Sequence, residues 1–143
     1  MNPAEINKRI AEACDRLKTQ DNRITENPMF CLQKLVRDVG YDTTFACNKC
    51  WLNSETEETI YDDDEDFKKE PEGDGWDEFG YVDRWEDVMV AFTEKALLEY
   101  MDLNGHNVNG FKRKTRIYVK SFNRCPEMIA IREKLLGLWE YSK

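Results

Sequence analysis

The sequence predicts an α+β domain, with a mostly antiparallel sheet of about four strands and three helices covering one of its faces. Two local patterns and the order of the elements lead to this prediction. The first segment repeats apolar residues at helical spacing, and residues 115–122 alternate apolar and polar residues as a strand does. The expected order is helix, three strands, helix, strand, helix, which is typical of an α+β domain.

The first helix is expected to begin close to the N-terminus. Asn2 is a good N-cap, Pro3 suits the first helical position, and Glu5 lies three residues past the cap, where it completes a capping box. The apolar positions that follow have a spacing of 3.6 residues and form one stripe: Ile6, Ile10, Ala13, Cys14 and Leu17.

Three strands are expected next. Residues Met29 to Val39 are rich in apolar and β-branched side chains and end before Gly40, which predicts the first strand. Trp51 to Tyr61 predicts a second, more polar strand. Tyr81 to Phe92 predicts a third, because apolar side chains occupy both of its faces.

The last three elements have clear start and stop signals. Thr93 is the expected N-cap of a second helix, and Asn104 and Gly105 are expected to end it. Residues Thr115 to Phe122 predict a strand, and Pro126 is expected to open the last helix. The apolar positions of that last helix include Met128, Ile131, Leu135 and Trp139.

Length and composition predict a single soluble domain over residues 1–143. Hydrophobic residues make up 41% of the chain, which is enough for one core, and no apolar run is long enough to cross a membrane. The N-terminus does not resemble a secretory signal. Five cysteines cannot all pair within one chain, so we expect free thiols and a reducing cytoplasm.

The net charge of −8 is distributed unevenly along the chain. Residues 55–78 carry 13 acidic and 2 basic side chains, whereas residues 105–143 carry 3 acidic and 9 basic ones. Repulsion among the acids, together with Pro71, Gly73 and Gly75, predicts that residues 55–78 form an acidic, mobile insertion between two folded halves.

Cys47 and Cys50 form a CxxC pair, a spacing that can hold one Zn²⁺ from a tight turn. A closed site would need two further ligands, but the remaining candidates include no second CxxC and no CxxH: Cys14, Cys31, Cys125 and His106. We therefore expect no cofactor, and most of the cysteines should be buried small side chains. His106, the only histidine, is expected to lie in the turn that ends a helix.

The basic C-terminal third suggests a nucleic-acid-binding face, on which cations neutralise phosphates and an aromatic ring stacks on a base. The alternative is a local patch that balances the acidic insertion, and the overall pI near 4.8 favours this alternative. The residues of the face are Lys112, Arg113, Lys114, Arg116, Tyr118 and Arg124, with Lys120 on the same strand.

One block of the sequence has several short motifs in a fixed order. They are Phe92-Thr93-Glu94-Lys95-Ala96, Asn104-Gly105-His106-Asn107, Ile117-Tyr118-Val119-Lys120-Ser121 and Arg124-Cys125-Pro126-Glu127-Met128. The block, which runs from Phe92 to Leu136, resembles one found in short uncharacterised proteins of phages and prophages. This resemblance implies a phage or mobile-element origin and action in the cytoplasm of a bacterial host.

These observations together predict an interaction protein and not an enzyme. An acidic segment can imitate the phosphate charge that nucleic-acid-handling machines bind, so we expect inhibition of a host defence or nucleic-acid-handling complex, as by anti-CRISPR proteins. The alternative is a regulatory phage module that binds nucleic acid through the basic face, with or without zinc. We expect a host protein or ribonucleoprotein complex as partner, and no membrane. The expected partner-binding residues are Asp62, Asp63, Asp64, Glu65, Asp66, Asp83, Glu86 and Asp87.

Overall fold

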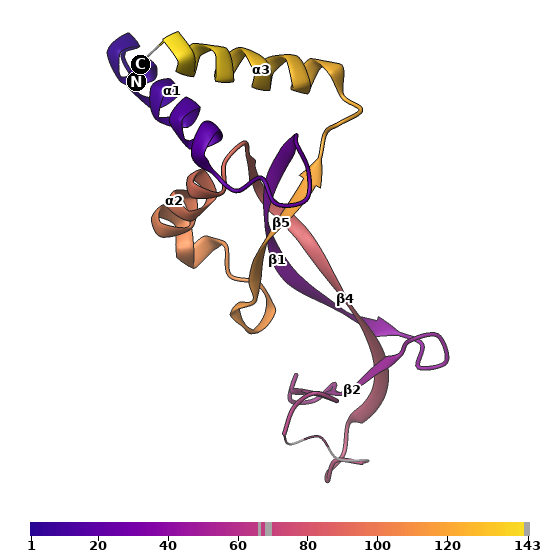
Figure 1. Ribbon diagram of the computed structural model, residues 1–143. Coiled ribbons are helices and arrows are strands. Elements are labelled where there is room, and N and C mark those ends of the chain that lie inside the picture. Colours follow the sequence, from indigo (N-terminus) through magenta and orange to yellow (C-terminus); the bar gives the residue numbers. More distant parts are fainter. Residues whose placement is uncertain (66, 68–69, 142–143) are drawn as a thin grey trace. The chain divides into compact units, whose positions relative to one another are not determined.

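The computed structural model describes residues 1–65, 67 and 70–141, without side-chain detail for 138–141. These residues form three α-helices and a five-stranded antiparallel sheet in the order β3-β2-β4-β1-β5 (Figure 1). The α+β class is confirmed, with one strand more than expected. The elements are α1 (Pro3–Thr19), β1 (Pro28–Tyr41), β2 (Asn48–Asn53), β3 (Thr59–Tyr61), β4 (Trp76–Ala91), α2 (Glu94–Asn104), β5 (Thr115–Ser121) and α3 (Pro126–Tyr141), with short 3₁₀ turns η1 (Gly105–Asn107) and η2 (Phe111–Arg113).

The chain divides into two compact units. Unit 1 comprises residues 1–34 and 86–143, and unit 2 comprises residues 35–85, which include the predicted insertion at 55–78. Strands β1 and β4 each contribute residues to both units. None of the described helices combines the length and the apolar composition that a membrane crossing requires.

The expected helix boundaries are confirmed by the capping contacts. Asn2 Oδ1 accepts a hydrogen bond of 2.9 Å from the Glu5 backbone N–H, and the Glu5 carboxylate accepts one from the Asn2 backbone N–H, which completes the capping box. Thr93 Oγ1 accepts a 3.2 Å bond from the Ala96 N–H at the start of α2. Helix α3 begins at Pro126, as expected.

The core of unit 1 is apolar. Phe30 and Leu32 on β1, Leu97 on α2 and Val119 on β5 pack together, with Val108 from the segment after η1. The register of β1 and β5 places Phe30 opposite Val119, so one face of this strand pair supplies side chains to the core. The three hydrophobic residues Phe30, Leu32 and Leu97 are fully buried.

The apolar stripes predicted for the outer helices are only partly correct. Cys14 and Leu17 are buried on α1, but Ile6 and Ile10 are exposed. On α3, Ile131 is 42% exposed, and its neighbour Arg132 is the buried residue instead. Helix α3 packs against α1, so the direction of that contact decides which side chains are covered.

The prediction of the second strand, which lies in unit 2, was wrong. Residues 51–61 do not form one strand, because a turn at 54–56 separates β2 from β3. The buried Asn53 side chain organises this turn: its Oδ1 accepts hydrogen bonds from the Glu55 and Thr56 N–H groups, and its Nδ2 donates to the Asp74 carbonyl. Strand β4 begins at Trp76, five residues before the predicted start, and pairs with β2.

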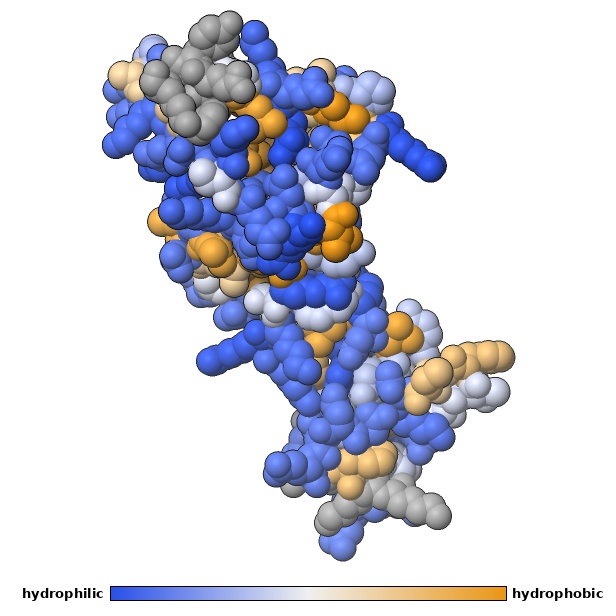
Figure 2. All heavy atoms as spheres, viewed as in Figure 1, coloured by the Kyte–Doolittle hydropathy of each residue, from blue (hydrophilic) through white to orange (hydrophobic). Residues whose placement is uncertain are grey.

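The molecular surface is mainly hydrophilic on the face shown in Figure 2, where the hydrophobic areas are small and separated. Docking that depends on a wide apolar patch is therefore not favoured on this face.

Candidate interaction surfaces

An arginine lies at the centre of unit 2. The Arg37 side chain, on β1, is only 3% exposed, and its guanidinium lies over two aromatic rings. The guanidinium carbon is 4.0 Å from the ring centroid of Tyr81 and 4.6 Å from that of Tyr61. The two rings meet edge to face, with their centroids 5.3 Å apart. Cation–π attraction to both rings therefore stabilises the position of the Arg37 guanidinium.

Two carboxylates neutralise this cation. Arg37 donates two hydrogen bonds to Asp63, at 3.0 and 2.9 Å, and two to Asp83, at 2.7 and 2.9 Å. Burial alone would lower the pKa of Arg37, but the hydrogen bonds to Asp83 and Asp63 raise it overall. Arg37 thus fixes two of the predicted partner-binding acids inside unit 2.

The neighbouring acids also have structural contacts. Asp62 accepts a hydrogen bond from the Tyr81 hydroxyl and another, of 2.9 Å, from the Lys49 backbone N–H. Burial and the contact with Asp62 raise the pKa of Tyr81. The Asp64 carboxylate accepts a 2.9 Å bond from the backbone N–H of Tyr61, at the end of β3. Asp66, also predicted to bind the partner, lies outside the described residues.

The two remaining acids with intramolecular partners belong to unit 1. Asp87 accepts hydrogen bonds from Lys120 Nζ at 2.8 Å and from Gln33 Nε2 at 2.7 Å. These bonds, that of Lys120 first, lower the pKa of Asp87. Glu86 pairs with Lys34 at 3.9 Å, and both side chains are partly exposed. The binding role of these acids stays a prediction.

A different set of acids remains without ion pairs to other described residues. All its members belong to unit 2 and have exposed side chains on the turns and strand ends between residues 55 and 77. Only Glu65 belongs to the set predicted from the sequence. We call them the unpaired acids: Glu55, Glu57, Glu58, Glu65, Glu70, Glu72, Asp74 and Asp77.

The charge of the chain is divided between its two units. Unit 2 has 16 acidic and 5 basic side chains, a balance of −11, whereas unit 1 has 13 acidic and 16 basic side chains, a balance of +3. The acidic character of the whole chain therefore arises in unit 2. Long-range attraction of a cationic partner would be directed to this unit.

The predicted basic face lies partly on β5. Arg116, Tyr118 and Lys120 alternate along this edge strand with the core-facing Ile117 and Val119, and all three are exposed. Arg116 donates a 2.8 Å hydrogen bond to Gln33 Oε1, and its guanidinium carbon lies 5.0 Å from the Tyr118 ring centroid. Since Lys120 is bonded to Asp87, part of this face is already neutralised.

The other cations of the basic face come before and after β5. Lys112 and Arg113 have φ values of 53° and 58°, and the Lys114 N–H donates a 3.1 Å bond to the Phe111 carbonyl. Although Lys112 and Arg113 belong to the segment labelled η2, their backbone is not helical there but has the features of a type I′ turn. The central positions of such a turn usually hold Asn or Gly, because positive φ is unfavourable for other residues. The turn exposes Lys112, Arg113 and Lys114, and Arg124 is exposed after β5.

The two cysteines of the CxxC pair differ in their exposure to solvent. Cys47 is exposed before β2, whereas Cys50 on β2 is completely buried. Burial raises the pKa of the thiols of Cys14, Cys31 and Cys50, which opposes the thiolate that a metal needs. No group of three or more His, Cys, Asp or Glu side chains suited to a metal occurs among the described residues. His106 is exposed in η1, after α2.

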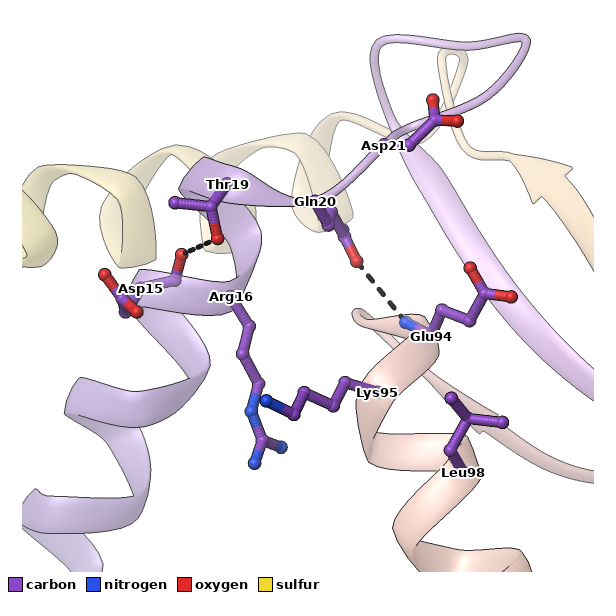
Figure 3. A pocket seen from close by; sticks show the side chains of 8 residues that line it. All are labelled: Asp15, Arg16, Thr19, Gln20, Asp21, Glu94, Lys95 and Leu98. Atoms are coloured by element: carbon purple, nitrogen blue, oxygen red, sulfur yellow. Dashed lines mark hydrogen bonds between the residues drawn. The ribbon is translucent and has the colours of Figure 1, made fainter.

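A cavity of about 440 Å³ in unit 1 lies between the C-terminal half of α1 and the first turn of α2. Figure 3 shows Arg16 and Lys95 extending into the space between the two helices. The Glu94 N–H donates a hydrogen bond of 3.3 Å to Gln20 Oε1. Arg16 is bonded to Glu99, and Glu94 is bonded to Arg23. The lining of this cavity therefore contains both acidic and basic side chains, and it does not favour any one class of ligand.

Comparison with known proteins found no matching protein-family model, no matching sequence among the curated proteins and no matching solved structure.

Proposed function

We propose that the protein is a phage-encoded interaction protein that binds a basic surface of a host defence or nucleic-acid-handling complex and inhibits that complex. The observation that carries this proposal is the charge of −11 on unit 2, beside +3 on the rest of the chain. Charge of one sign on one unit accelerates association with a surface of opposite charge and disfavours other partners.

The contacts of unit 2 indicate which acids are available to a partner. Asp62, Asp63, Asp64 and Asp83 hold Arg37, Tyr81 and backbone groups, so a partner would have to compete with these bonds. The unpaired acids have no such bonds to break within the described residues. The proposal therefore assigns binding first to the unpaired acids, of which Glu65 was predicted from the sequence.

The phage origin is a separate part of the proposal. It rests on the resemblance of residues 92–136, which lie in unit 1, and not on the charge of unit 2. Binding to a basic partner can therefore be correct even if the protein does not come from a phage. The proposed location of the protein, the cytoplasm of a bacterial host, rests on the same resemblance.

The decisive experiment measures inhibition with two charge-matched variants. The full chain is produced in bacteria whose CRISPR–Cas system clears a targeted plasmid, with several system types in parallel, and plasmid retention is counted. We expect the wild type to raise retention with at least one type. The variant Glu58→Gln, Glu65→Gln, Glu72→Gln should lose most of this effect.

The control variant removes three exposed carboxylates of unit 1: Asp102→Asn, Glu127→Gln and Glu133→Gln. It has the same net charge as the unit 2 variant, and it should keep the activity of the wild type. Equal losses in both variants would contradict the assignment to unit 2. Unchanged retention with every system type would contradict inhibition of CRISPR–Cas defence.

Nucleic-acid binding through the basic face is a second candidate function. The type I′ turn supports it, because Lys112 and Arg113 occupy backbone conformations that favour other residue types. Fluorescence anisotropy with a labelled single-stranded oligonucleotide in about 0.15 M salt tests it. Binding that is lost on replacing Lys112, Arg113 and Lys114 with Gln would favour this candidate over the first.

A further inference from the structure

Unit 2 has a cavity apart from the unpaired acids. It has a volume of about 360 Å³ and lies where the end of β1 and the following loop meet β4. Its lining comprises two aromatic residues, two acidic residues and two small residues: Gly40, Tyr41, Asp42, Thr43, Glu78 and Phe79. All of these residues belong to unit 2.

Two glycines build this cavity. Gly40 has a φ of +116°, a conformation that other residues rarely adopt, and it turns the chain at the end of β1. Gly80 on β4 lets the loop after β1 approach closely, since a Cβ atom there would lie 2.3 Å from the Ala46 Cβ and 3.2 Å from the Tyr41 carbonyl oxygen. The loop over residues 42–46 thus packs directly on β4.

The two carboxylates of the lining differ in their partners. Glu78 is 3.7 Å from Lys49 Nζ, an exposed pair that is weak in water. Asp42 has no ion pair within the described residues. Its Oδ1 accepts a 2.8 Å hydrogen bond from the Thr44 N–H, and the bonds to Thr44 hold the pKa of Asp42 below its usual value. Asp42 therefore brings an oriented negative charge to the cavity.

One aromatic residue of the lining is accessible from solvent, since Tyr41 is 48% exposed. Phe79 follows Glu78 on β4, so its ring points to the opposite face of the strand from the Glu78 side chain and the loop over residues 42–46. An aromatic ring beside a carboxylate is the combination that binds a guanidinium, which stacks on the ring and donates hydrogen bonds to the oxygens. Unit 2 already uses this combination once, where Tyr61, Tyr81 and two carboxylates hold Arg37.

We propose that this cavity receives an arginine side chain of the basic partner, held between the ring of Tyr41 and the carboxylate of Asp42. The inference rests on the proposed function, which supplies a cationic partner, and adds the residue type that the partner must present. An arginine is favoured over a lysine because a planar guanidinium can stack and donate two parallel hydrogen bonds at once.

The test uses labelled octa-arginine and octa-lysine peptides as probes for the full chain, with Kd measured by fluorescence anisotropy. We expect octa-arginine to bind about fivefold more tightly than octa-lysine, the gain from one stacked guanidinium with a charge-assisted bond. Asp42→Asn should remove most of that preference. Asparagine can still accept the Thr44 bond, so this variant is expected to keep the loop intact.

Asp77→Asn is the matched control, because it removes one exposed carboxylate of β4 that does not line the cavity. It should weaken both peptides equally and by less than about twofold, as expected for one screened surface charge. Tyr41→Leu removes a ring without changing the charge, and it should weaken only octa-arginine.

The outcomes separate this inference from the proposed function. Equal affinity for both peptides, or equal effects of Asp42→Asn and Asp77→Asn, would overturn the arginine cavity and leave binding by general charge attraction. If Tyr41→Leu keeps the full arginine preference, the stacking role is wrong. Failure of the wild type to bind either peptide would overturn both the cavity and the acidic binding surface.

Discussion

Units 1 and 2 bury different kinds of side chain. Unit 1 has an apolar core around Phe30, Leu32 and Leu97, whereas unit 2 surrounds a buried cation, Arg37, with aromatic rings and carboxylates. Residues 35–85 carry 16 acids, and few of their apolar side chains are buried, namely Leu35, Cys50 and Tyr81. Arg37 lowers the repulsion between two of these acids, Asp63 and Asp83, because it is bonded to both. The difference teaches that a strongly acidic unit can bury a cation among its carboxylates and aromatic rings.

The largest expected effect is in the core of unit 1. Phe30→Ala removes a fully buried ring, so we expect the free energy of unfolding to fall by about 3–5 kcal/mol, from lost burial and the remaining cavity. Denaturant unfolding followed by circular dichroism measures the loss. Val90→Ala, at a position 48% exposed, is the control and should cost under about 1 kcal/mol. Equal losses would contradict the assignment of the core.

A smaller and more local effect is expected from Arg37→Met. The change leaves Asp63 and Asp83 without their cation, and we expect a cost of about 2 kcal/mol, below that of a fully buried pair because both carboxylates are partly exposed. Amide hydrogen exchange should show loss of protection in β2 but not in α2. Arg84→Met, at an exposed ion pair, is the control and should change little. Equal loss of amide protection in β2 and α2 would contradict the assignment of the Arg37 cluster to unit 2 alone.

Tyr81→Phe tests the same cluster through its pH dependence. Near pH 7 the variant should lose about 1 kcal/mol, the value of one hydrogen bond, here to Asp62. The folded state raises the pKa of Tyr81, so its contribution is complete below the unfolded pKa of about 10 and is lost as pH rises through the folded value.

Melting temperatures between about pH 8 and 11 measure this difference, since the range spans the pKa of a free tyrosine. The wild type should lose stability above pH 10 more steeply than Tyr81→Phe does. Tyr118→Phe, at an exposed ring of unit 1, is the control and should follow the wild type. Identical slopes for wild type and Tyr81→Phe would show that the Asp62 contact does not affect the titration.

The smallest expected effect is local and leaves stability unchanged. The acidic insertion at 55–78 was predicted to be mobile, and its exposed glutamates are sites for a Glu-specific protease. We expect the first cuts within this range, identified by mass spectrometry, before any cut at Glu99 in α2. A first cut in a helix would contradict the prediction, and so would complete resistance of the insertion.

Local signals in the sequence predicted the helices well. Asn2 and Glu5 form the expected capping box, and Thr93 caps α2 as expected, because each contact involves residues three positions apart. The Arg37 cluster could not be predicted in this way. Its carboxylates come from residues 26 and 46 positions further along the chain, and only the fold brings them together.

The strand boundaries show a second limit. The turn after β2 contains no Gly or Pro, and its main signal was Asn53, whose side chain accepts hydrogen bonds from the backbone of the turn. The pairing of the acidic residues could not be predicted either. The sequence located the acids correctly, but it could not distinguish Asp63, which is bonded to Arg37, from Glu65, which has no ion pair within the described residues.

Strands β1 and β4 carry the chain out of unit 1 and back into it, and their arrangement affects which changes in sequence leave the core of unit 1 intact. The two strands are neighbours in the sheet, and Lys34 Nζ lies 3.9 Å from Glu86 Oε2 at the limits of unit 1. Residues 35–85 therefore leave and re-enter unit 1 on neighbouring strands. The core residues Phe30, Leu32, Leu97, Val108 and Val119 all lie outside residues 35–85, so a change in the length of this segment replaces no residue of that core.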